Sequence, residues 1–176
     1  TWLHKDLIAC IPDTEASDAA WDMQADIERA LLNKEALAVL LLDYTKLFDM
    51  FHPAWCERLL KATGFVGGRP ELVRELYSNL KRYSKIGKSF GPSISGANGL
   101  GQGDTFSVMI ALVMVDIQFR MIDAEFSLVR KSACLDDRSL RGGLDDLIKA
   151  YRRIQRFDFL AGHETNPKKI AISGTS

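Results

Sequence analysis

The sequence is poor in the residues that mark several protein classes. It holds three cysteines, three histidines and five prolines among 176 residues, and its cysteines form no C-x-x-C pair. An odd number of scattered cysteines excludes a disulfide framework and a zinc ribbon. Lys plus Arg total 23 and Asp plus Glu total 23, so the formal net charge is zero. The chain therefore lacks the overall basic charge that most simply indicates a nucleic-acid-binding protein.

Long hydrophobic segments are also missing. The longest wholly apolar runs cover residues 36–42 and 108–115, well short of the roughly 18 residues that a membrane-spanning helix needs. The first residues lack the basic-then-apolar order of a secretory signal peptide. We therefore expect an intracellular protein, nuclear or cytoplasmic, that is not secreted and has no membrane partner.

What is present fits one globular domain. Hydrophobic residues make up 47% and charged residues 26% of the chain, which argues against disorder. A chain of this length can bury a core of its own. We expect a single domain over residues 1–176, with a leading helical region over 1–35, and we expect it to be a fragment of a longer polypeptide because it begins with Thr rather than Met.

The zero net charge hides a gradient along the chain. Residues 1–57 carry four basic and eleven acidic side chains, whereas residues 58–90 carry eight basic and two acidic ones. Residues 138–176 are basic again, with eight against four. Two interpretations are open. The clusters are solvated helix surfaces, or phosphate-binding surfaces surround an acidic metal-binding centre.

Periodicity and breaker residues predict an alternation of helices and strands. Proline and glycine mark most boundaries. The expected helices cover residues 16–32, 53–62, 70–83, 106–123 and 144–160. The expected strands lie at 36–42, in a glycine- and serine-rich hairpin within 84–103, in a second hairpin at 126–140, and at 170–172.

Three aspartates stand where expected strands end or turn. Asp43 follows the apolar run 36–42, and Asp136 with Asp137 occupies the turn of the second hairpin. Acids in such places are often only turn formers or caps. However, carboxylates that converge on one edge of a sheet repel each other unless a divalent cation lies between them. Oxygen-only ligands suit Mg²⁺ or Mn²⁺, and paired ions of this kind catalyse phosphoryl transfer. The spacing allows a nucleotidyl-transfer site.

Four motifs then carry a family resemblance. Asp43-Tyr-Thr-Lys-Leu-Phe48-Asp49 resembles the D-x-x-K-x-F-D motif of reverse transcriptases, especially those of non-LTR retrotransposons and group II introns. Residues 98–107, N-G-L-G-Q-G-D-T-F-S, are similar to the G-x-x-Q-G-D-P-x-S motif. Residues 134–137, C-L-D-D, stand where the family has [YF]-x-D-D, and residues 162–170 resemble the later G-L-x-x-N-x-x-K-T element. The four occur in the order of the family.

The resemblance implies a fold and an activity. The fold is a polymerase palm of the α+β class, a small and mostly antiparallel sheet backed by helices, with partial fingers and no thumb. The activity is RNA-directed DNA polymerisation by two Mg²⁺ or Mn²⁺ ions. The implied partners are an RNA template, a DNA primer, a deoxynucleoside triphosphate, and the fingers and thumb segments of the parent polypeptide. An endonuclease segment is a further candidate.

The resemblance also implies a role for each matching residue. The catalytic carboxylates and metal ligands are Asp43, Asp136 and Asp137. The nucleotide-binding positions are Tyr44 through its main chain, Phe48 as the bulky residue that excludes a 2′-hydroxyl, Gln102 and Gly103 in the glycine-rich loop, and Lys169 near the triphosphate. Without the motif, Phe48 is a core residue beside a strand and Lys169 a solvated surface lysine.

The sequence departs from the family at several positions, and two alternatives stay open. Cys134 replaces the aromatic residue of the Asp-Asp box, and Thr105, Val108 and Ile170 replace the expected Pro, Pro and Thr. One alternative is a degenerate, non-catalytic reverse-transcriptase-like domain that still folds and binds nucleic acid. The other is a helical scaffold or interaction domain whose acids are caps and turns.

Overall fold

The computed structural model describes residues 3–8, 11–96 and 98–175. The chain forms two compact units. Unit 1 comprises Thr1–Thr45 and Ala111–Ser176, and unit 2 comprises Lys46–Ile110. Helix α5 (Thr105–Glu125) belongs to unit 1 from Ala111 onward.

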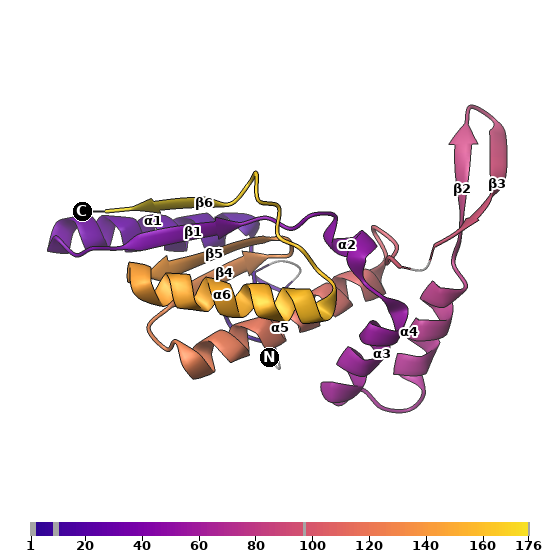
Figure 1. Cartoon of the computed structure of the whole chain (residues 1–176), viewed down its shortest axis with the longest axis horizontal. Coiled ribbons are helices and arrows are strands. Elements are labelled where there is room, and N and C mark those ends of the chain that lie inside the picture. The colour runs from indigo at the N-terminus through magenta and orange to yellow at the C-terminus, as the bar shows by residue number, and fades with distance from the viewer. Residues whose placement is uncertain (1–2, 9–10, 97, 176) are drawn as a thin grey trace. The chain divides into compact units, whose positions relative to one another are not determined.

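Unit 1 is built on a four-stranded antiparallel sheet with the order β4-β5-β1-β6. The strands are β1 (Ala38–Leu42), β4 (Arg130–Cys134), β5 (Asp137–Gly142) and β6 (Ala171–Gly174). The helices of this unit are α1 (Ala16–Asn33), the later part of α5, and α6 (Leu144–Ala161) (Figure 1). This arrangement confirms the α+β class and the small antiparallel sheet backed by helices.

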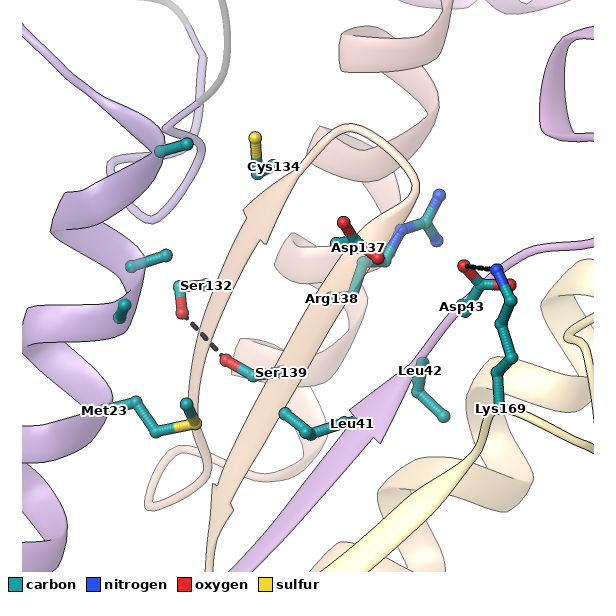
Figure 2. A pocket seen from close by; sticks show the side chains of 13 residues that line it. Met23, Leu41, Leu42, Asp43, Ser132, Cys134, Asp137, Arg138, Ser139 and Lys169 are labelled. Carbon is teal, nitrogen blue, oxygen red and sulfur yellow. Dashed lines mark hydrogen bonds and ion pairs between the residues drawn. The ribbon is translucent and has the colours of Figure 1, made fainter.

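Helix α1 lies against one face of this sheet through a mixture of polar and apolar contacts. Figure 2 shows Met23 of α1 beside the strands, where Ser132 of β4 and Ser139 of β5 are hydrogen-bonded to each other. Further along the helix, the buried carboxylate of Asp26 forms an ion pair with Arg141, at 3.1 Å between Oδ2 and Nε. Because Arg141 is almost fully buried, this pair fixes α1 against β5.

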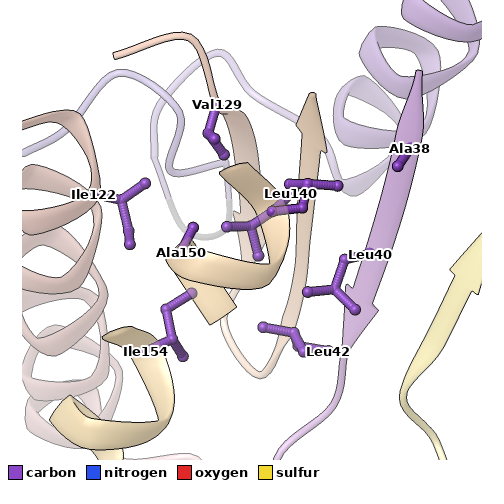
Figure 3. Close-up of a cluster of buried hydrophobic side chains, with 9 residues drawn as sticks. Ala38, Leu40, Leu42, Ile122, Val129, Leu140, Ala150 and Ile154 are labelled. Atoms are coloured by element: carbon purple, nitrogen blue, oxygen red, sulfur yellow. The ribbon is translucent and has the colours of Figure 1, made fainter. Parts of the chain in front are cut away.

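The opposite face of the sheet packs on α5 and α6 and forms the core (Figure 3). Alternate residues of β1 point to this face because successive side chains of a strand face opposite ways. The core cluster contains only apolar side chains: Ala38, Leu40, Leu42, Ile122, Val129, Leu140, Leu147, Ala150 and Ile154. The core therefore holds the ends of β1 and β5 at fixed positions, and these ends carry the aspartates.

Helix α5 is apolar on nearly every side. By length and composition alone it is long and apolar enough to cross a bilayer. In its most apolar window, 61% of the residues are buried inside the protein, and a helix that is hydrophobic all round is also what the centre of a core requires. Its apolar character is accounted for by its position under the sheet.

The described part of unit 2 contains three complete helices, a two-stranded hairpin and the first residues of α5. The complete elements are α2 (Leu47–Met50), α3 (Pro53–Ala62), α4 (Arg69–Ser78), β2 (Lys81–Ile86) and β3 (Ser89–Ser95). Helices α3 and α4 are linked by ion pairs, with Glu57 bonded to Arg74 at 3.1 Å and Lys61 bonded to Glu71 at 2.5 Å.

Two expected boundaries were wrong. The helix expected over 70–83 ends at Ser78, where Asn79 caps it and the chain turns into β2. The strand expected from residue 126 starts only at Arg130. Its first residues still follow helical geometry, because the Phe126 N–H donates to the Ile122 carbonyl at 2.7 Å. In both cases tertiary pairing moved a boundary that local periodicity placed elsewhere.

Candidate active site

The antiparallel pairing of β1 and β5 places two of the predicted aspartates side by side. Leu42 pairs with Arg138 at the end of the ladder. Asp43 directly follows Leu42, and Asp137 directly precedes Arg138, so their carboxylates lie at the same end of the sheet (Figure 2). Asp136 belongs to the two-residue turn that joins β4 to β5. One end of one sheet therefore carries all three carboxylates.

The charges of these carboxylates affect one another. Burial, followed by the negative charges of Asp136 and Asp43, raises the pKa of Asp137 above its usual value, and Lys169 partly opposes this. The ionised form of Asp137 is therefore disfavoured first by loss of hydration and then by repulsion from the neighbouring carboxylates. A cation placed among the three groups would relieve this repulsion.

Lys169 is the cation that the protein itself supplies. Its ammonium group lies 3.0 Å from Oδ1 of Asp43 (Figure 2). The segment before it is fixed by main-chain bonds, because the Asn166 N–H donates to the Asp43 carbonyl at 2.8 Å and the Thr45 N–H donates to the Glu164 carbonyl at 2.9 Å. The structure thus brings Lys169 to Asp43, and the role near a triphosphate that the resemblance implies for Lys169 stays a prediction.

The donor set suits a magnesium-type ion, although the geometry is not that of a closed metal site. Among residues 3–8, 11–96 and 98–175, no three side chains of His, Cys, Asp or Glu are clustered closely enough to hold a metal ion. The available donors are hard carboxylate oxygens, which Mg²⁺ and Mn²⁺ prefer, and these ions take much of their shell from water and phosphate. Asp43, Asp136 and Asp137 therefore fit as an open, partial ligand set.

The pKa shift of Asp137 leads to a prediction about stability. Because the folded state binds the Asp137 proton more tightly than the unfolded chain, stability falls as pH rises from the usual pKa of 3.8 through the raised value. At neutral pH without metal, Asp137→Asn should therefore raise the melting temperature, by about 1–2 °C for an exposed site. Added Mg²⁺ should stabilise the wild type more than the variant.

Melting temperatures of the wild-type chain and of the variant, each measured with and without millimolar Mg²⁺, check this prediction. Glu28→Gln removes an exposed carboxylate on α1, away from the strand ends, and should leave both melting temperatures unchanged. The electrostatic account of this site would be contradicted if Asp137→Asn melted at a lower temperature than the wild type at pH 7. It would also be contradicted if Mg²⁺ raised the melting temperature of the variant as much as that of the wild type.

An apolar cavity of about 500 Å³ opens beside the carboxylates. It lies between α1 and the sheet, with Asp43, Asp137 and Lys169 at one end (Figure 2). Half-buried Cys134 also lines it. Where the resembled motif has an aromatic ring, this chain therefore has a small side chain beside the cavity.

The side chain of Tyr44 lies on the other face of the sheet, in a buried polar network. Its hydroxyl donates to Oδ2 of Asp158 at 2.7 Å and accepts from Nη1 of Arg138 at 2.7 Å. The Arg138 guanidinium lies 3.9 Å from the centre of the Tyr44 ring. Gln118 of α5 bonds to Arg138 and, at 3.0 Å, to Asp158 of α6. The network thus joins Tyr44, which follows Asp43, to Arg138, which follows Asp137.

The network is almost wholly shielded from water. Burial raises the pKa of Asp158, while the charge of Arg138 and the bonds from Tyr44 and Gln118 oppose this rise. Burial likewise raises the pKa of the Tyr44 hydroxyl well above its usual range. Tyr44 and Gln118 each bond to both Arg138 and Asp158. A buried network of this kind favours one arrangement of its strands because other arrangements leave its polar groups unpaired.

Sequence reasoning missed Arg138, Gln118 and Asp158. A signal for Asp158 was present, because it follows the buried Ala150 and Ile154 at helical spacing on the inner face of α6. A charged residue at a core position of an amphipathic helix indicates a buried partner. The sequence pattern could have indicated that a partner exists, but not that Arg138 is the partner.

The remaining predicted residues belong to unit 2. Phe48 is half-buried, and its carbonyl accepts a hydrogen bond from the Leu100 N–H at 2.8 Å. Gln102 and Gly103 are exposed in the loop that follows. Gly103 has a φ of +83° with open space around it, a conformation that favours glycine. The structure brings Phe48 to the start of the glycine-rich loop.

Asp104 fixes the end of that loop. It caps α5 by accepting a hydrogen bond from the Phe106 N–H at 3.3 Å, and it also accepts a hydrogen bond from the Tyr77 hydroxyl. The Ser107 hydroxyl donates to the Gly101 carbonyl at 2.6 Å. These contacts anchor the loop where the prolines of the resembled motif are absent.

Comparison with known proteins shows that the fold is similar to part of the fold of telomerases. No family model matches the sequence, and no curated protein matches it. Solved structures do match. Telomerase from Candida tropicalis, in a complex with the TWJ fragment of telomeric RNA, superposes with a TM-score of 0.73 at 11% identity, over 98% of this chain and 31% of that one.

Two further telomerase structures agree. Apo telomerase from Candida tropicalis truncated from its C-terminal domain gives a TM-score of 0.69 at 14% identity, over 98% of this chain and 37% of that chain. Telomerase from Candida albicans gives a TM-score of 0.67 at 11% identity, over 96% of this chain and 32% of that chain. This chain has a reverse-transcriptase-like, palm-containing fold and spans about a third of the length of these telomerases.

Proposed function

We propose that the chain is the palm of an RNA-directed DNA polymerase that transfers deoxynucleotides to a primer 3′-hydroxyl. The single observation that carries the proposal is the juxtaposition of Asp43 and Asp137 at one end of the sheet, with Asp136 in the adjoining turn. That juxtaposition occurs in a fold shared with telomerase, and the same residues stand in motifs that resemble those of non-LTR retrotransposon and group II intron enzymes.

In this proposal the three aspartates hold two Mg²⁺ ions, with the Tyr44 main chain as a further ligand. When bound, such ions activate the 3′-hydroxyl and neutralise charge on the leaving pyrophosphate. The mutual repulsion of the carboxylates and their oxygen-only chemistry support this assignment. The Lys169 ammonium, which pairs with Asp43 in the structure, would turn to the triphosphate of the incoming nucleotide.

The residues of unit 2 would handle the nucleotide and template. Gln102 and Gly103 offer exposed side-chain and backbone groups, and an open glycine lets a ligand approach the main chain closely. The matching telomerases from Candida tropicalis and Candida albicans are in complex with a fragment of telomeric RNA, which supports an RNA partner here. The DNA primer and the fingers and thumb of a longer polypeptide complete the proposed assembly.

Phe48→Ala tests the proposed sugar gate. Removing the ring should open space for a 2′-hydroxyl, so that incorporation of ribonucleotides relative to deoxynucleotides rises by about tenfold or more. Phe159→Ala removes a ring that is 82% exposed and should leave this ratio unchanged. Competing single-nucleotide incorporation measures the ratio, and an unchanged value for Phe48→Ala would reduce Phe48 to a packing residue.

The function is tested by primer extension. The complete polypeptide that contains this chain, given an RNA template, an annealed DNA primer, the four deoxynucleoside triphosphates and Mg²⁺, should extend the primer stepwise. Chelation of the metal should stop extension. A folded polypeptide that binds the template–primer without extending it would favour the non-catalytic relative, an alternative motivated by Cys134 in the Asp-Asp box.

A further inference from the structure

The β2–β3 hairpin of unit 2 exposes every one of its residues. It is closed by the two-residue turn Gly87–Lys88, in which Gly87 has a φ of +58°. Apolar and aromatic side chains on a hairpin are normally buried, yet Tyr83 is 54% and Phe90 68% exposed. An exposed patch of this kind indicates a binding surface.

The pairing register assigns these side chains to faces. Lys81, Tyr83 and Lys85 alternate along β2 and therefore share one face. Phe90 pairs with Lys85 and lies on that face too, with the Lys85 ammonium 5.6 Å from the centre of its ring. We call Lys81, Tyr83, Lys85 and Phe90 the Lys–aromatic face. Ile94, which pairs with Arg82, lies on the opposite face.

The charge around the Lys–aromatic face has one sign. The hairpin and its turn carry four basic residues, Lys81, Arg82, Lys85 and Lys88, and residues 76–103 contain no acid. A surface with this composition attracts phosphate groups. Tyr83 pairs with Ser93 and Phe90 pairs with Lys85, on either side of a register shift. The two exposed rings therefore occupy separate positions on this face, and each can present a surface to a separate base.

We propose that the Lys–aromatic face binds single-stranded RNA, with phosphates on the lysines and unpaired bases stacked on Tyr83 and Phe90. Alternating cationic and aromatic side chains match the alternating phosphates and bases of a single strand, whereas bases paired in a duplex cannot stack on side chains. The choice of RNA rests on the proposed function, in which the strand is the template. The binding surface itself does not depend on catalysis.

Fluorescence anisotropy with a labelled, unstructured RNA of about 15 nucleotides, within the usual range of single-strand site sizes, measures this binding on the chain. Tyr83→Ala and Phe90→Ala should each weaken binding by about 5- to 100-fold, since one stacked base contributes about 1–3 kcal/mol. Lys85→Gln should weaken it and lower the salt-dependence slope by about 0.7–1. Ile94→Ala, on the opposite face, should change it less than twofold.

Equal binding by Tyr83→Ala, Phe90→Ala and the wild type would overturn the proposal, and so would equal weakening by Ile94→Ala. Tighter binding of a duplex or of DNA than of the RNA would also overturn it. If the wild type fails in primer extension while the Tyr83 and Phe90 variants still lose RNA binding, the proposed function fails and the surface stands. If primer extension succeeds and the Tyr83 and Phe90 variants bind RNA as the wild type does, the proposed function stands and the proposed binding surface fails.

Discussion

Asp43→Asn is expected to abolish RNA-templated primer extension by the complete polypeptide, with a rate at least about 10³-fold below that of the wild type. Such a loss corresponds to about 4 kcal/mol of lost transition-state stabilisation. The amide keeps the size of the side chain but removes the negative charge. It would therefore both weaken the proposed metal ligands and release Lys169, whose ammonium lies 3.0 Å from Asp43. Asp136→Asn should have the same effect.

A matched control separates this effect from unfolding. Asp49 lies in the same motif on α2 and is exposed, so Asp49→Asn removes a carboxylate six positions away without touching the strand end. It should leave the extension rate within about twofold. Asp43→Asn should also melt close to the wild-type temperature. Extension that persists in a folded Asp43→Asn variant would show that this carboxylate is only a turn residue.

Arg138→Met is expected to destabilise the fold by about 3–5 kcal/mol, the typical cost of leaving a buried charge without its partner. The variant removes the positive charge that opposes the effect of burial on Asp158, a residue that is 2% exposed, and it removes the hydrogen bond from Arg138 to Tyr44. For a chain of this size, the melting temperature should fall on the order of 10 °C. Chemical denaturation of the chain measures the free energy of unfolding directly.

The double variant Arg138→Met, Asp158→Leu gives the control. Replacing a buried pair by apolar side chains is often close to neutral, and Gln118 remains 3.3 Å from the Tyr44 hydroxyl as a partner for it. The double variant should therefore recover more than half of the stability lost by Arg138→Met alone. If the free energy of unfolding of Arg138→Met lies within about 1 kcal/mol of the wild-type value, the range of ordinary substitutions, the network does not hold the strand ends in place.

Much of the site region was predictable because it depends on local sequence. The apolar run before Asp43 predicted the end of a strand, and the structure has it as β1. The turn predicted at Asp136–Asp137 was placed one residue late, because the turn of the β4–β5 hairpin is Leu135–Asp136 and Asp137 already pairs with Cys134. The pairing of β1 with β5 follows from the need to bury the apolar faces of both strands. The roles of Asp43, Asp136, Asp137, Phe48, Gln102, Gly103 and Lys169 remain predictions that rest on the motif resemblance and on this geometry.

The buried network was not predictable in the same way. Arg138 follows an aspartate in a turn, and Asp158 lies 20 positions later in a helix. Nothing local distinguishes Arg138 from a surface arginine until β5 pairs with β1 and turns its side chain towards α5 and α6. The hairpin was placed a few residues late for a related reason, since cross-strand pairing rather than helical periodicity decides residues 79–83.

The central claim is that the end of the β1–β5 ladder binds the catalytic metal ions. Anomalous diffraction from crystals of the complete polypeptide with Mn²⁺, an RNA–DNA template–primer and an incoming nucleotide tests it most directly. The account predicts manganese peaks within coordination distance of Asp43 and of Asp136 or Asp137, with the Lys169 ammonium displaced from Asp43. A bound nucleotide with no peak at these carboxylates, and Lys169 still paired with Asp43, would contradict it.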